Sequence, residues 1–321
     1  MRMHARRASC SPARSGWCGS AAAAGRWGAV GPPGETAPVV TVKQLASPFV
    51  SSDAGTLTDA VVLRPSAAVD RLPPVKGEPS PIADRAIDQH AVLVRTLEDR
   101  GISVHAIEPR TRSACESLVA DCALLLPEGA IVARPSQTDR RAEVAAVEAL
   151  LAELGIPILA RIEPPGVLDA TDVAVAPGRL FIGVPAAGAG LRPRSNELGR
   201  RQLEVVATQH GYGVVELTVA SDVPRLRDVF SIVGVETALA APDRVDLVPV
   251  TGVNIVELPR GEEFAAGVLP IGERRVLANL RFRESLVLMR KAKIAVEAID
   301  LWEFGKAGFG PFSLVLAVKR T

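Results

Sequence analysis

Short apolar runs, turn residues and amphipathic segments follow one another in the same order several times along the chain from about Leu57 onward. The clearest copy begins at Asp121 and reads DCALLLPEGAIVARPSQTDRRAEVAAVEALLAELGIPIL. It contains two apolar runs separated by a Pro-Glu-Gly turn, a segment rich in Ala, Leu and Glu, and a third short run. Apolar runs bounded by turn signals predict buried strands, and the longer segment predicts a helix. One copy is therefore a ββαβ unit.

The same unit recurs. Asp172 opens a second copy, with a helix expected over residues 196–210 and a strand over 213–217, and Asp228 opens a third. DAVVLRP with IADRAIDQHAVLVRTLEDRGISVHAI forms a partial fourth copy, and RRVLANL with ESLVLMRKAKIAVEAI, followed by GFGPFSLVLAV, closes a fifth. Such repeats bury a continuous core when they pack side by side. The predicted fold is α/β, a five-bladed β/α propeller of ββαβ repeats with pseudo-fivefold symmetry. A pair of ordinary α/β domains is the alternative.

Residues 1–56 lack this pattern. The first 34 residues are rich in Arg, Ser, Ala and Gly and end in Pro-Pro-Gly. A targeting peptide, a basic tail and translated sequence upstream of the true start are three explanations. The twin Arg6-Arg7 is followed by no useful apolar stretch, which argues against an export signal. We expect residues 1–56 to be a disordered basic tail or a misplaced start, and residues 57–321 to form a single propeller domain.

Net charge and the length of the apolar runs exclude some classes of function. The chain has 321 residues, 48% of them hydrophobic, and a net charge of +1. Five arginines and no acidic residue stand before residue 35, so the remainder is mildly acidic, which argues against nucleic acid as a partner. No apolar run is long enough for a membrane span. The interpretation is a globular protein of the cytoplasm.

Four cysteines stand at positions 10, 18, 115 and 122. The first two, with His4, lack the short paired spacings of a zinc site. No cysteine follows Cys122, so neither a disulfide scaffold nor a metal quartet is indicated. A reducing compartment fits this usage, and we expect no metal and no cofactor.

Five stretches, taken in order, carry a resemblance to a known family: DRAIDQHAVLVRTLEDRGISVHAI, LVADCALLLPEGAIVARPSQTDRRAEV, LDATDVAVAPGRLFIGV, RPRSNELG and EEFAAGVLPIGERRVLANL. Together they resemble the dimethylarginine dimethylaminohydrolase branch of the guanidino-group-modifying superfamily, which includes arginine deiminases and amidinotransferases. The match is collinear over about residues 57–320. The resemblance implies a five-bladed β/α propeller, in agreement with the repeats.

In that family a thiolate attacks the guanidinium carbon, a histidine transfers protons, and carboxylates hold the planar cation. The resemblance places the cysteine at Pro311, in the loop KAGFGPFSLVLAVKR, and the histidine at Arg225, in PRLRDVFSIVG. Proline has no nucleophilic side chain, and an arginine cannot serve as a general base at neutral pH. We therefore expect the family's Cys-dependent hydrolysis to be lost, so whether the chain is an enzyme of any kind is open.

Fewer of the carboxylates that hold the guanidinium in the family are present as well. The resemblance matches their positions to Cys115, Ala120 and Asp121, and matches the family's Gly-Gly-Asp to Ala170-Thr171-Asp172. By contrast, the resemblance matches Arg140 and Arg194 to the arginines that hold the substrate's α-carboxylate in the family. The candidate ligand-binding residues are Arg140, Arg194, Asp121, Asp172, Arg225, Cys115 and Phe312.

Each candidate also has an ordinary structural explanation. Arginines at helix starts often pair with nearby acids. An aspartate that recurs at the start of each unit, as Asp121, Asp172 and Asp228 do, is equally consistent with a turn or cap. Cys115 as a relocated nucleophile has no nearby histidine or helix start to lower its pKa.

Three hypotheses remain open. In the first, a non-hydrolytic protein binds a small carboxylate-containing ligand in the propeller funnel, because Asp121 and Asp172 face three arginines while Phe309, Pro311 and Phe312 supply an apolar end. In the second, the funnel serves a thiol-independent enzyme of cyclisation, isomerisation or proton transfer. In the third, the chain is an active guanidino hydrolase with a relocated nucleophile. In each case the partner is a small molecule, without nucleic acid or membrane, and a homodimer is a further option.

Overall fold

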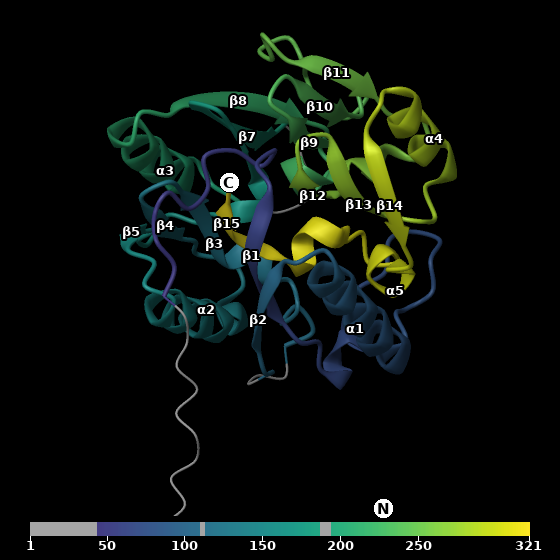
Figure 1. The fold of residues 1–321 in the computed structure, drawn as a ribbon, viewed down its shortest axis with the longest axis horizontal. Coiled ribbons are helices and arrows are strands. Elements are labelled where there is room, and N and C mark those ends of the chain that lie inside the picture. The colour runs from purple at the N-terminus through teal and green to yellow at the C-terminus, as the bar shows by residue number, and fades with distance from the viewer. Residues whose placement is uncertain (1–43, 110–112, 187–193) are drawn as a thin grey trace, which may run out of the picture. The chain divides into compact units, whose positions relative to one another are not determined.

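The computed structural model describes residues 44–109, 113–186 and 194–321, which contain five three-stranded sheets (Figure 1). The strands, sheet by sheet, are β15 (Leu316–Arg320), β1 (Leu57–Leu63) and β2 (Ser103–Ile107); β3 (Ala123–Leu126), β4 (Gly129–Val132) and β5 (Ile158–Arg161); β6 (Val173–Ala176), β7 (Arg179–Pro185) and β8 (Gly213–Val219); β9 (Phe230–Gly234), β10 (Thr237–Ala240) and β11 (Asn254–Glu257); and β12 (Leu269–Gly272), β13 (Arg275–Asn279) and β14 (Ala295–Ile299). The sheets follow one another round a ring in Figure 1. The predicted α/β five-bladed propeller is confirmed.

Each sheet with its crossover is one blade, and the blades share one pairing pattern. The middle strand pairs antiparallel with one neighbour and parallel with the other, as β4 does with β3 and β5. A helix lies in the crossover of four blades: α1 (Ala83–Asp99), α2 (Arg141–Glu153), α3 (Glu197–Gln209) and α4 (Arg283–Lys291). From β10 to β11 the chain crosses through residues 241–253 without an α-helix, so the third copy departs from the predicted ββαβ unit.

The last strand of the chain completes the first blade. β15 pairs antiparallel with β1, with Leu316 opposite Val61 and Ala317 opposite Ala60. The sequence analysis joined this strand to the fifth copy, and that assignment is wrong, because β12 supplies the first strand of the fifth blade. The partial copy that contains β1 and β2 has no first strand of its own in the sequence. β15 takes the place of that strand and closes the ring.

Five short 3-10 turns, the entry turns, lead into the first strands of the blades. They are η2 (Val119–Cys122), η4 (Ala170–Asp172), η5 (Leu226–Asp228), η6 (Glu263–Ala266) and η7 (Pro311–Leu314). Consecutive entry turns contact one another from η2 to η6, and η7 contacts η2. Gly310 and Gly267 bring η7 against η6, because a Cβ at position 310 would lie 2.1 Å from the Gly267 carbonyl oxygen. The entry turns therefore form a closed ring.

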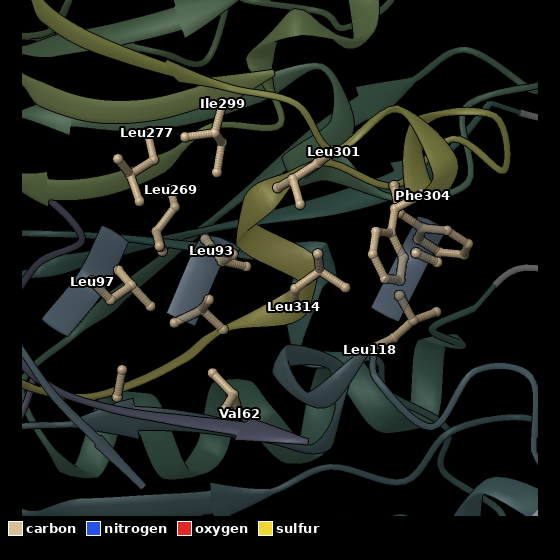
Figure 2. Packing of buried hydrophobic residues seen from close by; sticks show 14 of the residues in the cluster. Val62, Leu93, Leu97, Leu118, Leu269, Leu277, Ile299, Leu301, Phe304 and Leu314 are labelled. Carbon is tan, nitrogen blue, oxygen red and sulfur yellow. The ribbon is translucent and has the colours of Figure 1, made fainter. Parts of the chain in front are cut away.

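An apolar cluster anchors η7 to its neighbours (Figure 2). Leu93 and Leu97 of α1 pack with Val62 of β1, with Leu269 of β12 and with Leu314 of η7. Each buried leucine or valine contributes roughly 1.5–3 kcal/mol to folding. A short helix, α5 (Trp302–Gly305), places Phe304 in the same cluster. The turn that begins at Pro311 is thus held by packing from two blades.

Residues 44–56 belong to the propeller, so the predicted boundary at residue 57 is wrong. Phe49 and Val50 are 2% and 3% exposed. The amide of Phe49 donates to the Pro127 carbonyl at 2.9 Å, and the amide of Arg320 donates to the Phe49 carbonyl at 2.7 Å. This segment has no apolar period because it packs as an irregular strap. The predicted disordered tail otherwise falls on residues 1–43, which lie outside the described residues.

Among the helices of the described residues, none has the length and apolar character that a bilayer crossing requires.

Candidate functional site

The ring of entry turns brings the predicted ligand-binding residues together. Asp121 lies in η2, Asp172 in η4, and Arg225 immediately before η5. Arg140 ends the 3-10 helix η3 (Thr138–Arg140), and Arg194 stands shortly before α3. The charges of these side chains act on one another's ionisation. We call these five residues, with the three acids described below, the entry-turn cluster.

Arg140 lies in the interior. Its side chain is 1% exposed, and its Nη1 donates to Oδ2 of Asp121 at 2.8 Å. Nε donates to Glu143 at 3.0 Å, and Nη2 donates to the Leu118 carbonyl at 3.0 Å. Burial of Asp121 opposes its ionisation, but the adjacent Arg140 guanidinium holds its pKa below the usual range. The structure thus gives Arg140 internal partners, where the sequence analysis expected it to contact a ligand.

Arg194 is the more accessible of the two retained arginines. Its side chain is 25% exposed, and Nη1 donates to Oδ2 of Asp169 at 3.2 Å. Asp169 is buried, and the sequence analysis did not consider it. Burial, together with the charge of Asp121, raises the pKa of Asp169 to about 6. Arg194 therefore has a neighbour whose charge is lost just below neutral pH.

Asp172 connects two blades. Its Oδ2 accepts a hydrogen bond of 2.5 Å from the Ser195 hydroxyl, and its Oδ1 accepts one of 3.3 Å from the Leu226 amide in η5. Burial and the neighbouring Asp169 raise its pKa to about 7. The carboxyl group of Asp172 thus caps the next entry turn, which agrees with the turn or cap role considered in the sequence analysis. Its raised pKa also places its loss of a proton near neutral pH.

Arg225 is enclosed by aromatic and acidic groups. Its side chain is 1% exposed, and its Nε donates to Asp228 at 2.9 Å. Nη2 donates to the Gly308 carbonyl at 2.9 Å. The guanidinium carbon lies 4.3 Å from the ring centroid of Phe309 and 5.9 Å from that of Phe312. Arg225, which the resemblance matches to the family's histidine, is therefore stacked and paired within the fold.

The two candidate positions for a nucleophile differ. Pro311 begins η7 and is buried. Cys115 is partly exposed, and its Sγ lies 3.8 Å from Oε1 of Gln137. Burial raises the pKa of the Cys115 thiol, which outweighs the nearby guanidinium of Arg140. A thiol with a raised pKa is a weak nucleophile at neutral pH.

Three acids complete the entry-turn cluster: Glu143 and Asp169, which the sequence analysis missed, and Asp228, which it named only as the start of a repeat unit. Glu143 stands three residues after Arg140, and Asp228 stands three residues after Arg225. This i, i+3 spacing is the signal that could have identified Glu143 and Asp228 as partners of these arginines.

With these acids, five carboxyl groups face three guanidinium groups, whereas the sequence analysis counted two acids against the three arginines. Burial raises the pKa of four of them: Glu143, Asp169, Asp172 and Asp228. The predicted apolar end is also altered, because Phe309 and Phe312 are buried and flank Arg225. No group of His, Cys, Asp and Glu within the described part of the chain is arranged to hold a metal ion.

Comparison with curated proteins finds two dimethylarginine dimethylaminohydrolases among the relatives of this chain. No protein-family model matches the chain. The N(G),N(G)-dimethylarginine dimethylaminohydrolase of Pseudomonas aeruginosa is 27% identical over 220 residues, which cover 67% of this chain and 83% of the relative. The protein of the same name from Streptomyces coelicolor is 26% identical over 224 residues, which cover 69% of this chain and 81% of the relative.

Solved structures share the fold. A dimethylarginine dimethylaminohydrolase from Pseudomonas aeruginosa, complexed with citrulline, has a TM-score of 0.72 at 22% identity and covers 81% of this chain and 99% of its own. An amidinotransferase of a saxitoxin biosynthetic pathway, from Microseira wollei, has a TM-score of 0.71 at 14% identity and covers 85% and 97%. These likenesses establish the architecture of the chain.

Proposed function

The chain is a relative of the dimethylarginine dimethylaminohydrolases within the guanidino-group-modifying superfamily, and from this premise we propose that it is a non-hydrolytic member that binds a small carboxylate-containing ligand at the entry-turn cluster. Guanidinium hydrolysis by the family's route needs a thiolate and a base that takes and releases a proton. The resemblance assigns these roles to positions that hold Pro311 and Arg225.

The observation that carries the proposal is the setting of Arg225. A guanidinium cannot accept a proton at neutral pH. This one is also tied to Asp228 and to the Gly308 carbonyl, each at 2.9 Å, and it stacks on Phe309. The reaction end of the family's site is thus occupied by a fixed cation. A bound guanidinium substrate would meet like charge there, which disfavours it.

Arg194 is the residue through which the ligand is held. At 25% side-chain exposure it is open to a ligand, whereas Arg140 and Arg225 are each 1% exposed. A guanidinium presents a planar fork of donors that fits a carboxylate. Because the pKa of Asp169 is raised to about 6, its competition for Arg194 weakens below that pH. The affinity for carboxylates should therefore increase as the pH falls from 7.5 to 5.5.

Calorimetric titration of the purified full chain tests this proposal. Acetate, succinate and benzoate are compared with arginine and dimethylarginine at both pH values. We expect at least one carboxylate to bind more tightly than the guanidino compounds. Arg194→Ala should weaken it about tenfold or more, in line with loss of a charge-assisted pair. Arg201→Ala is the matched control, because Arg201 is 70% exposed and pairs with Glu197 on the surface of α3.

Tighter binding of arginine or dimethylarginine would contradict the proposed ligand class. Equal binding by Arg194→Ala and the wild-type protein would remove Arg194 from the site.

A thiol-independent proton-transfer enzyme is a second candidate, and one observation favours it. Asp169 and Asp172 are neighbouring buried carboxyl groups with pKa values raised to about 6 and about 7. General acid–base catalysis works best with groups that titrate near the working pH. This candidate predicts that the protein catalyses deuterium incorporation from solvent into a carbon acid and that Asp172→Asn abolishes it. The measurement is NMR of small carboxylates and ketones in D2O.

A further inference from the structure

A small cavity lies among the first strands of the blades, inside the ring. Its volume is about 60 Å³, and its walls come largely from apolar side chains of β3, β6 and β15 with Leu269 of β12. Three charged residues also line it: Asp53, Arg227 and Arg320. None of these three was a candidate from the sequence, and the proposed ligand site does not use them. We call this space the central cavity.

The charges of the central cavity do not balance. Asp53, Arg227 and Arg320 are 6%, 8% and 3% exposed, and together they carry a net charge of +1. Nη1 of Arg227 donates to Oδ2 of Asp53 at 2.7 Å. Within the described residues, the side chain of Arg320 donates only to backbone carbonyls: that of Gly55 at 2.8 Å and that of Pro270 at 2.9 Å. One buried cation therefore lacks a counter-charge of its own.

Two donors on these cations lack acceptors. Within the described residues, Nε of Arg227 and Nε of Arg320 have no hydrogen-bond partner. An unsatisfied donor on a buried charged group is costly, and the large majority of buried polar atoms in native structures have a hydrogen-bond partner. The pair points to an acceptor supplied from outside the chain.

We propose that the central cavity binds a small monovalent anion of the size of chloride between Arg227 and Arg320. One negative charge neutralises the net +1 of the lining. A volume of about 60 Å³ suits a halide or nitrate and excludes a larger metabolite. The apolar remainder of the wall favours a weakly hydrated ion.

The titration behaviour of Arg320 agrees with this charge imbalance. Burial and the neighbouring Arg227 lower the pKa of Arg320 to about 10, although Asp53 opposes them. The guanidinium nevertheless remains charged at neutral pH and would gain from an added anion.

The central cavity lies next to the entry-turn cluster. The ring centroid of Phe312 lies 5.3 Å from the guanidinium carbon of Arg227 and 5.9 Å from that of Arg225. Ala120 also lines the cavity, at a position where the resemblance expects a carboxylate. An acid at position 120 would supply negative charge to this wall, and its replacement by alanine leaves that role to an ion.

Thermal unfolding of the full chain in two salts tests the proposal. Sodium chloride is compared with sodium gluconate at equal ionic strength, from about 10 to 300 mM, because gluconate is too large for the cavity. We expect chloride to raise the melting temperature by about 2–4 °C more than gluconate. Arg320→Met should lose this difference. Arg260→Met should keep it, because Arg260 is 85% exposed and pairs with Asp243 at the surface.

Identical melting curves of the wild-type protein in the two salts would overturn the proposal. So would a chloride-specific shift that Arg320→Met retains in full. If Arg320→Met does not fold, crystals of the wild-type protein grown in sodium bromide decide the question: an anomalous peak beside Arg227 and Arg320 supports the site, and its absence refutes it.

Discussion

The guanidinium of Arg225 lies over the ring of Phe309, with 4.3 Å between the guanidinium carbon and the ring centroid. Nε of the same side chain donates to Asp228, so the cation is held between an aromatic face and a carboxylate. Both charged residues are 1% exposed. Arg225, which the resemblance matches to the family's histidine, is thus one half of a buried ion pair.

Removing one partner of this pair should be more harmful than removing both. Arg225→Met leaves Asp228 buried without its cation, which should lower the free energy of unfolding by roughly 3–5 kcal/mol. Arg225→Met combined with Asp228→Leu removes both charges and should recover much of that loss. Urea unfolding of the two single variants and the double variant measures the coupling. Additive losses would show that the pair does not act as a unit.

Restoring a thiol should not restore hydrolysis. Pro311→Cys should release no citrulline, ammonia or methylamine from arginine, its methylated forms or agmatine, because position 225 holds no base and position 120 no carboxylate. Titration of accessible thiols verifies that the new cysteine is reduced. Turnover by the wild-type protein that disappears in Cys115→Ser would contradict this expectation and identify a relocated nucleophile.

The stability contributed by Asp172 should fall as pH rises. Its folded-state pKa is raised to about 7 by burial, whereas an unfolded aspartate titrates near 4. Between these values the folded state binds a proton that the unfolded chain has released, so stability is highest at low pH and is lost as pH rises through 7. Asp172→Asn stays neutral and keeps an acceptor for the Leu226 amide.

Asp172→Asn should therefore lie within about 1 kcal/mol of the wild-type protein near pH 4.5 and exceed its stability by about 2–4 kcal/mol at pH 8. Chemical unfolding at pH 4.5, 6 and 8 checks this, with Glu204→Gln, an exposed change on α3, as the control. A gap that stays constant across these pH values would be inconsistent with the raised pKa.

Two truncations separate the N-terminal sequence from the strap that follows it. Deletion of residues 1–43, which show no apolar pattern, should leave the melting temperature unchanged. Deletion of residues 1–50 also removes Leu45, Phe49 and Val50, each at most 9% exposed, and should lower the free energy of unfolding by roughly 3 kcal/mol or more. Differential scanning calorimetry compares them. Equal melting temperatures would show that the strap contributes nothing to stability.

The sequence by itself determined the repeating unit and the lack of a cysteine in the final loop. Alternating strands, turns and helices are local patterns, so each copy could be read within its own segment. The placement of Asp121, Asp172 and Asp228 at equivalent entry turns follows from the same repetition. The absence of any cysteine after Cys122 holds whatever the fold.

Only the tertiary structure decided which distant groups meet. β15 pairs with β1 from the other end of the chain, and residues 44–56 pack although they carry no period. The ionisation of the entry-turn cluster was also beyond the sequence, since it depends on which acids are buried beside which arginines. Arg140 and Arg225 became interior ion pairs because ring closure removed their surroundings from water, and a buried charge must find its partner within the fold.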